Sequence, residues 1–185
     1  MNRKLLLLNA LFILDPHASA VQFHAVAALH AFEAKVPDLK GEASVDNGLA
    51  SAHGRLTMQV RTIDTNVSLR NTEMLKLLEP DKYPEITFIL KSAVALPNVT
   101  DDGRVIEDLP GGETKCALHG ELVIHGHTAA VEGKGKCQDQ GAKGWTVTGD
   151  APVDMTAFGI APPRLAFFTM DKMVTVNYML VFRQR

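Results

Sequence analysis

Two side-chain types in this sequence could carry chemistry, the seven histidines and the two cysteines. His125 and His127 have an i, i+2 spacing, which places two ring nitrogens on one face of a strand. A zinc site needs a third or fourth ligand, and neither a carboxylate nor a thiolate is placed by spacing to supply one. We therefore expect turn or surface histidines and no metal site.

The cysteines, Cys116 and Cys137, lack the C-x-x-C spacing of thiol-exchange proteins. They end a segment in which apolar or small residues alternate with polar ones, as in a half-buried antiparallel hairpin. Folding this segment about Gly126-His127 sets Cys116 opposite Cys137 on one face. This register predicts a structural disulfide. Because disulfides persist mainly in oxidising compartments, the pair also favours export.

Motifs for catalysis or cofactor binding are missing from the sequence. It contains no G-x-S-x-G, no H-E-x-x-H, no phosphate-binding loop and no G-x-G-x-x-G. The formal net charge is −2, and no block of lysine and arginine forms a basic patch for nucleic acid. We expect no catalytic residues, no cofactor and no nucleic-acid partner.

Alternation with period two runs through most of the chain and predicts about eight strands. Turn signals such as 46–48 (DNG) and 110–112 (PGG) separate them. Eight antiparallel strands close into a barrel whose interior holds side chains or one small ligand. The predicted strands are 21–29, 36–45, 56–61, 85–91, 116–125, 128–137, 147–155 and 174–182.

One segment, 66–79, has helical spacing instead and predicts a short helix near residues 69–79. Thr72 is a candidate N-cap, and Pro80 ends the helix. Such a helix would lie over one end of the barrel. It would act either as a lid or as a plug that completes the core.

The N-terminus resembles an export signal. A basic start, an apolar run and the Ala18-Ser19-Ala20 site predict a leader over residues 1–14, with cleavage as late as residue 20. The apolar run is short for a membrane span. The barrel domain would then cover 15–185. In the alternative interpretation, Leu14 onward already belongs to the first strand.

Several short motifs together resemble the YceI-like family. Residues 82–88 (KYPEITF) match its K-Y-P-x-I-x-F stretch, 120–128 (GELVIHGHT) match G-x-L-x-I-H-G-x-T, and 158–160 (FGI) match its late F-G-I. Residues 15–23 are similar to its opening strand. The chain departs from the family at Arg70-Asn71, where many members have Arg-Asp. The resemblance covers residues 14–183.

The resemblance implies an all-β, eight-stranded, lipocalin-like antiparallel barrel that is usually periplasmic. It implies binding of a long-chain isoprenoid, quinone or fatty-acid-type lipid in the lumen, as a carrier or storage protein without catalytic residues. Two alternatives stay open: a cofactor-free barrel enzyme for an apolar substrate, and a stress-related structural barrel with no ligand. The oligomeric state is also open, with a homodimer as one option.

The predicted lumen-facing residues are the candidate ligand site, since they occupy the apolar faces of the strands. Methionines and flat aromatic rings among them suit a long flexible tail. Spacing gives no support for a headgroup contact from His30 or Arg70. The candidate residues are Phe23, Leu29, Met58, Val60, Phe88, Leu118, Leu122, Ile124, Val153, Met155 and Tyr178.

Overall fold

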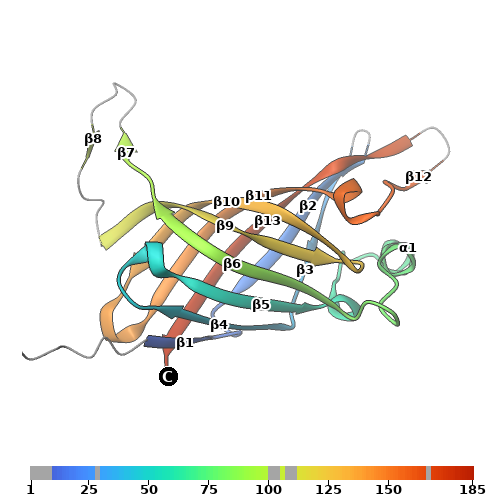
Figure 1. Cartoon of the computed structure of the whole chain (residues 1–185). Helices are drawn as coiled ribbons and strands as arrows, with labels where there is room; N and C mark the ends of the chain where they lie inside the picture. The colour runs from blue at the N-terminus through green and yellow to red at the C-terminus, as the bar shows by residue number, and fades with distance from the viewer. Residues whose placement is uncertain (1–9, 28–29, 100–104, 107–111, 166–167) are drawn as a thin grey trace, which may run out of the picture.

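Eight strand positions form a closed antiparallel barrel in the computed structural model (Figure 1), which describes residues 10–27, 30–99, 105–106, 112–165 and 168–185. The sheet closes because β13 pairs with β11 on one side and with β1 on the other, where Leu14 lies opposite Phe182. The expected barrel with one short helix is confirmed. In sheet order the wall is β1 (Ala10–Leu14), β4 (Leu39–Val45), β5 (His53–Gln59), β6 (Glu85–Ala95), β9 (Glu113–Ile124), β10 (His127–Asp139), β11 (Trp145–Asp154) and β13 (Phe168–Gln184).

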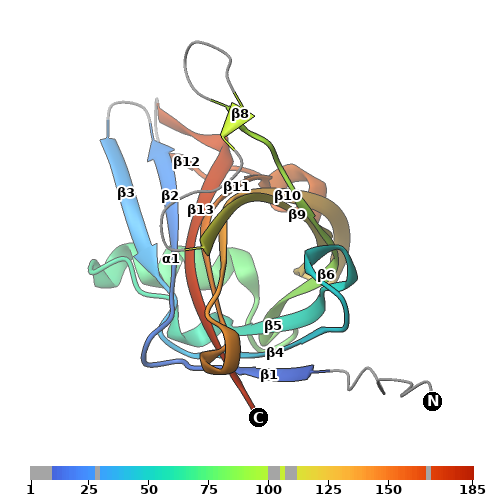
Figure 2. The same cartoon turned by 90° about the vertical axis from the view of Figure 1, so that its left-hand side faces the viewer.

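A hairpin of β2 (Ala20–Ala27) and β3 (His30–Lys35) continues the wall beyond β1 and β4. β2 pairs with the long β13, and Figure 2 shows the hairpin standing beside the ring formed by the other strands. The sequence pattern predicted a single strand over 21–29. In the structure β2 ends at Ala27 and a second strand, β3, begins at His30. The remaining short elements are β7 (Asn98–Val99), β8 (Val105–Ile106), β12 (Arg164–Leu165), η1 (Leu49–Ser51), η2 (Val60–Thr62), η4 (Gly141–Lys143) and η5 (Met155–Phe158).

The register of the β9–β10 hairpin differs from the predicted one. The two-residue turn is His125-Gly126, not Gly126-His127, so Cys116 lies opposite Gly135 and Cys137 opposite Thr114. Both turn residues have positive φ, 52° and 75°, as a type I′ turn requires. The slip keeps every side chain on its predicted face. The Cys116–Cys137 disulfide forms diagonally, with Cα atoms 6.0 Å apart.

The helix α1 spans Ser68–Leu78, which confirms the predicted segment. Its N-cap is Val67, with no side-chain cap, so the prediction of a Thr72 cap is wrong. Thr72 lies inside the helix and donates a hydrogen bond to the Ser68 carbonyl. The helix ends at Glu79, which is left-handed and precedes Pro80. Within the described residues, the helices are too short or too polar to cross a membrane.

Strand β1 lies in the segment predicted as a leader. Its residues pair with β4 and β13 and contribute Phe12 and Leu14, both buried, to the barrel interior. The pairing of Leu14 agrees with the alternative interpretation, in which the first strand already includes this residue. The leader and its cleavage site stay predictions.

The two ends of the barrel differ. α1 and β12 lie at one end, and the C-terminus lies at the other (Figure 1). Near the C-terminal end, the disulfide packs with Ala52, Ala93 and Leu118 and with the flanking Trp145 in a separate small core. Side chains therefore fill most of that end. The interior next to α1 is not filled in this way.

Candidate functional site

The barrel encloses a cavity of about 630 Å³ that runs inward from the end covered by α1. Side chains from β2, β5, β6, β9, β11 and β13 form its walls, and α1 and η5 complete it. Nearly all of these side chains are apolar, and many of them belong to the main hydrophobic cluster of the barrel. A volume of this size is typical of sites for small molecules.

The predicted site residues converge on this cavity, with two exceptions. Val60 is buried but begins η2, where its N–H donates to the Pro84 carbonyl and its side chain packs in the core rather than on the cavity wall. Leu29 lies outside the described residues. The nine that line the cavity are Phe23, Met58, Phe88, Leu118, Leu122, Ile124, Val153, Met155 and Tyr178.

The prediction missed two groups of lining residues. The first continues the inward alternation of strands already identified, so the same period-two signal could have found it: Val21, Ala25, Ile86, Val174, Val176 and Leu180. The second comes from β3 and from α1 with the residue before it. Helical spacing predicts the helix but not which of its side chains meet the cavity, because that depends on how α1 docks. Its members are Phe32, Val67, Leu69, Arg70, Glu73, Met74, Leu77 and Leu78.

The mouth of the cavity lies between α1 and the start of β3, because the exposed lining residues gather there. Leu69 is 74% exposed and Leu77 is 36% exposed, although both line the cavity. The charged or titratable side chains of the mouth are His30, Arg70 and Glu73. The mouth is therefore amphipathic, whereas the deeper walls are apolar.

Polar contacts help to hold α1 over the cavity, where its apolar side chains pack against the core but are only partly buried. Asn71 bonds both Asp64 and Thr65, at 2.7 and 2.8 Å, and Asp64 in turn exchanges two backbone hydrogen bonds with Lys35 at the end of β3. The Arg70 guanidinium lies 4.4 Å from the centre of the Phe32 ring on β3. The start of the helix is thereby tied to the hairpin that forms the other side of the mouth.

The far end of α1 docks on the β9–β10 turn. His125 bonds Glu79 at 2.6 Å, and its ring packs 4.6 Å from that of Tyr83. A Cβ atom on Gly126 would lie 2.6 Å from the Tyr83 ring, and its φ is positive, so the turn requires glycine. These contacts explain why the tyrosine of the 82–88 motif and the His-Gly turn occur together. The tyrosine and the turn together hold the end of α1 over the cavity.

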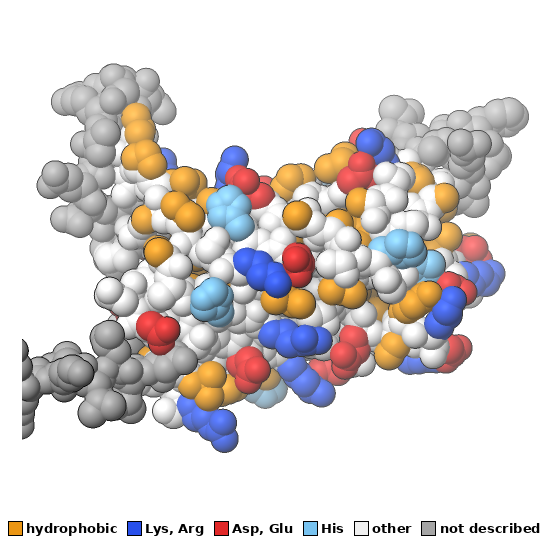
Figure 3. Space-filling model, viewed as in Figure 1, with side chains coloured by type: hydrophobic (Ala, Val, Ile, Leu, Met, Phe, Trp, Pro, Cys, Tyr) orange, Lys and Arg blue, Asp and Glu red, His pale blue; other side chains and the backbone are white. Residues whose placement is uncertain are grey.

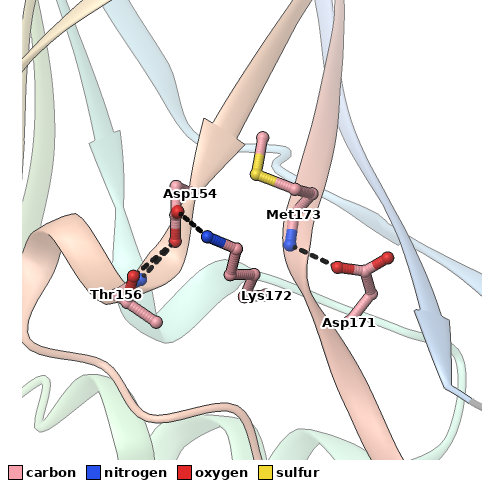
Figure 4. Close-up of polar contacts among 5 residues, drawn as sticks. All are labelled: Asp154, Thr156, Asp171, Lys172 and Met173. Carbon is pink, nitrogen blue, oxygen red and sulfur yellow. Dashed lines mark hydrogen bonds and ion pairs between the residues drawn. The ribbon is translucent and has the colours of Figure 1, made fainter.

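A second polar cluster fixes η5, the other cover (Figure 4). Asp154 accepts hydrogen bonds from the backbone N–H and the hydroxyl of Thr156 and pairs with Lys172 of β13 at 2.8 Å. The Lys172 ammonium, followed by the Thr156 donors, lowers the pKa of the Asp154 carboxyl to about 2. The cluster positions Met155, which lines the cavity, and the buried Phe158.

Replacing Asp154 by asparagine should give an acid-sensitive stability difference from the natural chain. The folded-state pKa lies below the ordinary value of 3.8, so the carboxylate stabilises the fold above pH 4. That contribution disappears as the pH falls toward 2. Denaturation of both chains from pH 6 to pH 2 should show D154N less stable at pH 6 and the gap closing toward pH 2. A gap independent of pH would contradict the role of this charge.

Deep inside the cavity the structure offers little acid–base chemistry. Among the lining residues that the structure describes, Tyr178 is the only titratable group deep in the cavity, and its hydroxyl donates to the Lys134 carbonyl at 3.4 Å. Burial raises the pKa of Tyr178 to about 12, so the hydroxyl stays neutral at ordinary pH. Among the described residues no three His, Cys, Asp or Glu side chains are grouped to hold a metal ion.

The outer face shown in Figure 3 carries acidic and basic side chains side by side. Lys91 pairs with Glu121 at 3.0 Å and Lys136 with Glu113 at 2.9 Å. Mixed charges of this kind give no field of one sign over this face.

A closed eight-stranded barrel with an apolar lumen, a capping helix and an amphipathic mouth defines a lipocalin-like barrel. The chain belongs to the YceI-like family, whose domain model matches residues 12–182. Solved structures agree in fold. BcnA of Burkholderia cenocepacia superposes with a TM-score of 0.70 at 17% identity, covering 91% of this chain and 98% of that one.

Two further solved structures are similar. A polyisoprenoid binding domain from Saccharophagus degradans, described as implicated in plant cell wall breakdown, gives a TM-score of 0.70 at 16% identity over 94% of this chain and 98% of that one. The YceI protein of Campylobacter jejuni gives 0.59 at 14% identity, over 82% and 84%. No curated protein matches the chain by sequence.

Proposed function

We propose that this protein binds one long-chain amphipathic lipid, with the tail in the barrel and the polar end at the mouth, and serves as its carrier or store. The observation that carries the proposal is the cavity of about 630 Å³ with apolar walls. The family match and the solved domain described as polyisoprenoid binding support a tail of isoprenoid or fatty-acid type.

The energetics favour a tail as the main determinant of affinity. At about 0.8 kcal/mol per buried methylene, a tail of roughly fifteen carbons contributes about 12 kcal/mol. Ordering and association cost at least about 4 kcal/mol, which leaves an affinity no tighter than about micromolar. The mouth residues His30, Arg70 and Glu73 offer the polar end both donors and an acceptor.

A binding role also fits the placement of titratable groups better than an enzymatic one does. A cofactor-free enzyme needs an acid and a base that converge on the substrate with shifted pKa values. Here the deep wall offers one neutral phenol, and the charged groups lie at the mouth.

We further propose that the protein works in the periplasm. The Cys116–Cys137 disulfide supports this compartment, because such bonds persist where the environment is oxidising.

Calorimetric titration with fatty acids and isoprenoid alcohols tests the proposed binding. Affinity should rise with tail length from about four to about sixteen carbons at constant headgroup, with one-to-one stoichiometry and a negative heat-capacity change. An affinity that follows the headgroup and ignores the tail would overturn it.

A further inference from the structure

The lumen contains a second, smaller cavity of about 70 Å³ behind the first. It lies at the end closed by the disulfide, and its walls include Phe12, Ala93, Cys137 and Trp145. Four side chains belong to the walls of both cavities: Leu56, Phe88, Leu118 and Leu180. We call these four the partition residues, because they separate the two chambers.

The partition is built from four strands and is well packed. Leu56 of β5 lies opposite Phe88 of β6, while Leu118 comes from β9 and Leu180 from β13. The three leucines are only 7–8% exposed. They are therefore fixed by neighbours on both sides, so a tail that reaches them meets a closed floor.

A glycine on the neighbouring strand sets the position of the Phe88 ring. A Cβ atom on Gly120 would lie 2.5 Å from a carbon of that ring. The ring thus occupies the space that a side chain on β9 would otherwise fill. Phe88 is the largest of the four partition side chains, so it contributes most to the floor.

We propose that the partition residues set the length of the lipid tail that the barrel accepts, an inference that rests on the proposed lipid binding. If each heavy atom takes about 30 Å³, as a water molecule does in the liquid, the main chamber of about 630 Å³ holds about twenty. That corresponds to a tail of about four isoprene units. Carbons beyond this length stay outside the mouth and add little affinity.

Opening the partition should move this limit. Phe88→Ala removes six carbon atoms and joins the smaller chamber, which holds about two more heavy atoms on the same measure. The limit should therefore rise by at least one isoprene unit. A ligand of five units should then bind at least tenfold more tightly than one of four units to the variant, and equally tightly to the natural chain.

Ile86→Ala is the matched control. Ile86 lies on the same strand two residues nearer the mouth and lines only the main chamber. Its truncation removes three carbon atoms, less than one isoprene unit, and leaves the floor closed, so the length limit should not move by a full unit. Leu180→Ala, with Val176→Ala as its own control on β13, repeats the test if F88A fails to fold.

The experiment is native mass spectrometry and competition binding with isoprenoid alcohols of two to eight units on the full chain and these variants. If F88A or L180A accepts longer tails and the controls do not, the partition residues determine the tail length. Limits that are equal in all folded variants overturn it and leave lipid binding intact. Failure of the natural chain to bind any member of the series, and any fatty acid in the calorimetric titration, overturns the proposed function itself.

Discussion

Ala151→Trp should lower lipid affinity by at least tenfold while the barrel stays folded. Ala151 lies on β11 with its side chain on the cavity wall, so an indole there occupies space that the tail would fill. Losing contact with about 60 Å² of apolar tail costs about 1.5 kcal/mol at roughly 25 cal/mol per Å². That cost corresponds to about tenfold in Kd. Titration of both chains with one fatty acid and with one isoprenoid alcohol measures the change in Kd.

The matched control is Asp150→Trp, which places the same side chain on the adjacent, exposed position of β11. Neighbouring strand residues point to opposite faces, so this variant should bind like the natural chain. A graded series, Ala151→Val, →Leu and →Trp, separates loss of cavity space from misfolding. Valine favours strands, so the first member should fold, and affinity should fall as the side chain grows. Equal affinity across the folded members of the series would contradict a ligand in the lumen.

Removing the disulfide should lower the free energy of unfolding substantially. Replacing both Cys116 and Cys137 by alanine removes a crosslink between residues that are 21 apart in sequence. In the chain-entropy model, closing a loop of this length stabilises the fold by about 3 kcal/mol. For a chain of this size the midpoint of thermal unfolding should fall by about 6–12 °C. Calorimetry of both chains measures the shift.

Two comparisons make this prediction specific. The natural chain with its disulfide reduced should unfold near the midpoint of the double-alanine variant, since both lack the same crosslink. Both cysteines are almost fully buried, and alanine avoids leaving an unpaired polar group there. A midpoint unchanged by reduction and by the double substitution would show that the hairpin needs no crosslink.

Much of the barrel could be predicted from alternation alone. Val21, Phe23, Ala25 and Ala27 share one face in the sequence, and all four line the cavity. The same holds for the inward faces of β5, β6, β9 and β13. Period two determines which face is inward once a strand is recognised, so nine of the eleven predicted site residues lie on the cavity.

The errors arose where backbone conformation, rather than hydrophobic pattern, decides the structure. The register of β9 and β10 depends on which residues adopt positive φ, and His125 takes one of these positions. A non-glycine residue rarely adopts positive φ. This rule favours a turn that begins with glycine, Gly126-His127, whereas the structure has His125-Gly126. Between Ala27 and His30 no glycine, proline, asparagine or aspartate signals that one strand ends and the next begins.

The amphipathic mouth could not be predicted for a different reason. Arg70 and Glu73 reach the cavity only because α1 is tied to β3 through Asn71 and Asp64. These contacts join segments that no local pattern relates. Helical spacing predicted the helix, but its docking depends on the side-chain and backbone hydrogen bonds that link it to β3.

The most direct test of lipid binding is native mass spectrometry of the purified natural chain, followed by solvent extraction and identification of what it carried. We predict one amphipathic lipid per chain, lost in Ala151→Trp and kept in Asp150→Trp. The same intact mass reports the N-terminus and the disulfide. A mass of the protein alone, with no uptake of any added isoprenoid or fatty acid, would contradict the account and favour a barrel without a ligand.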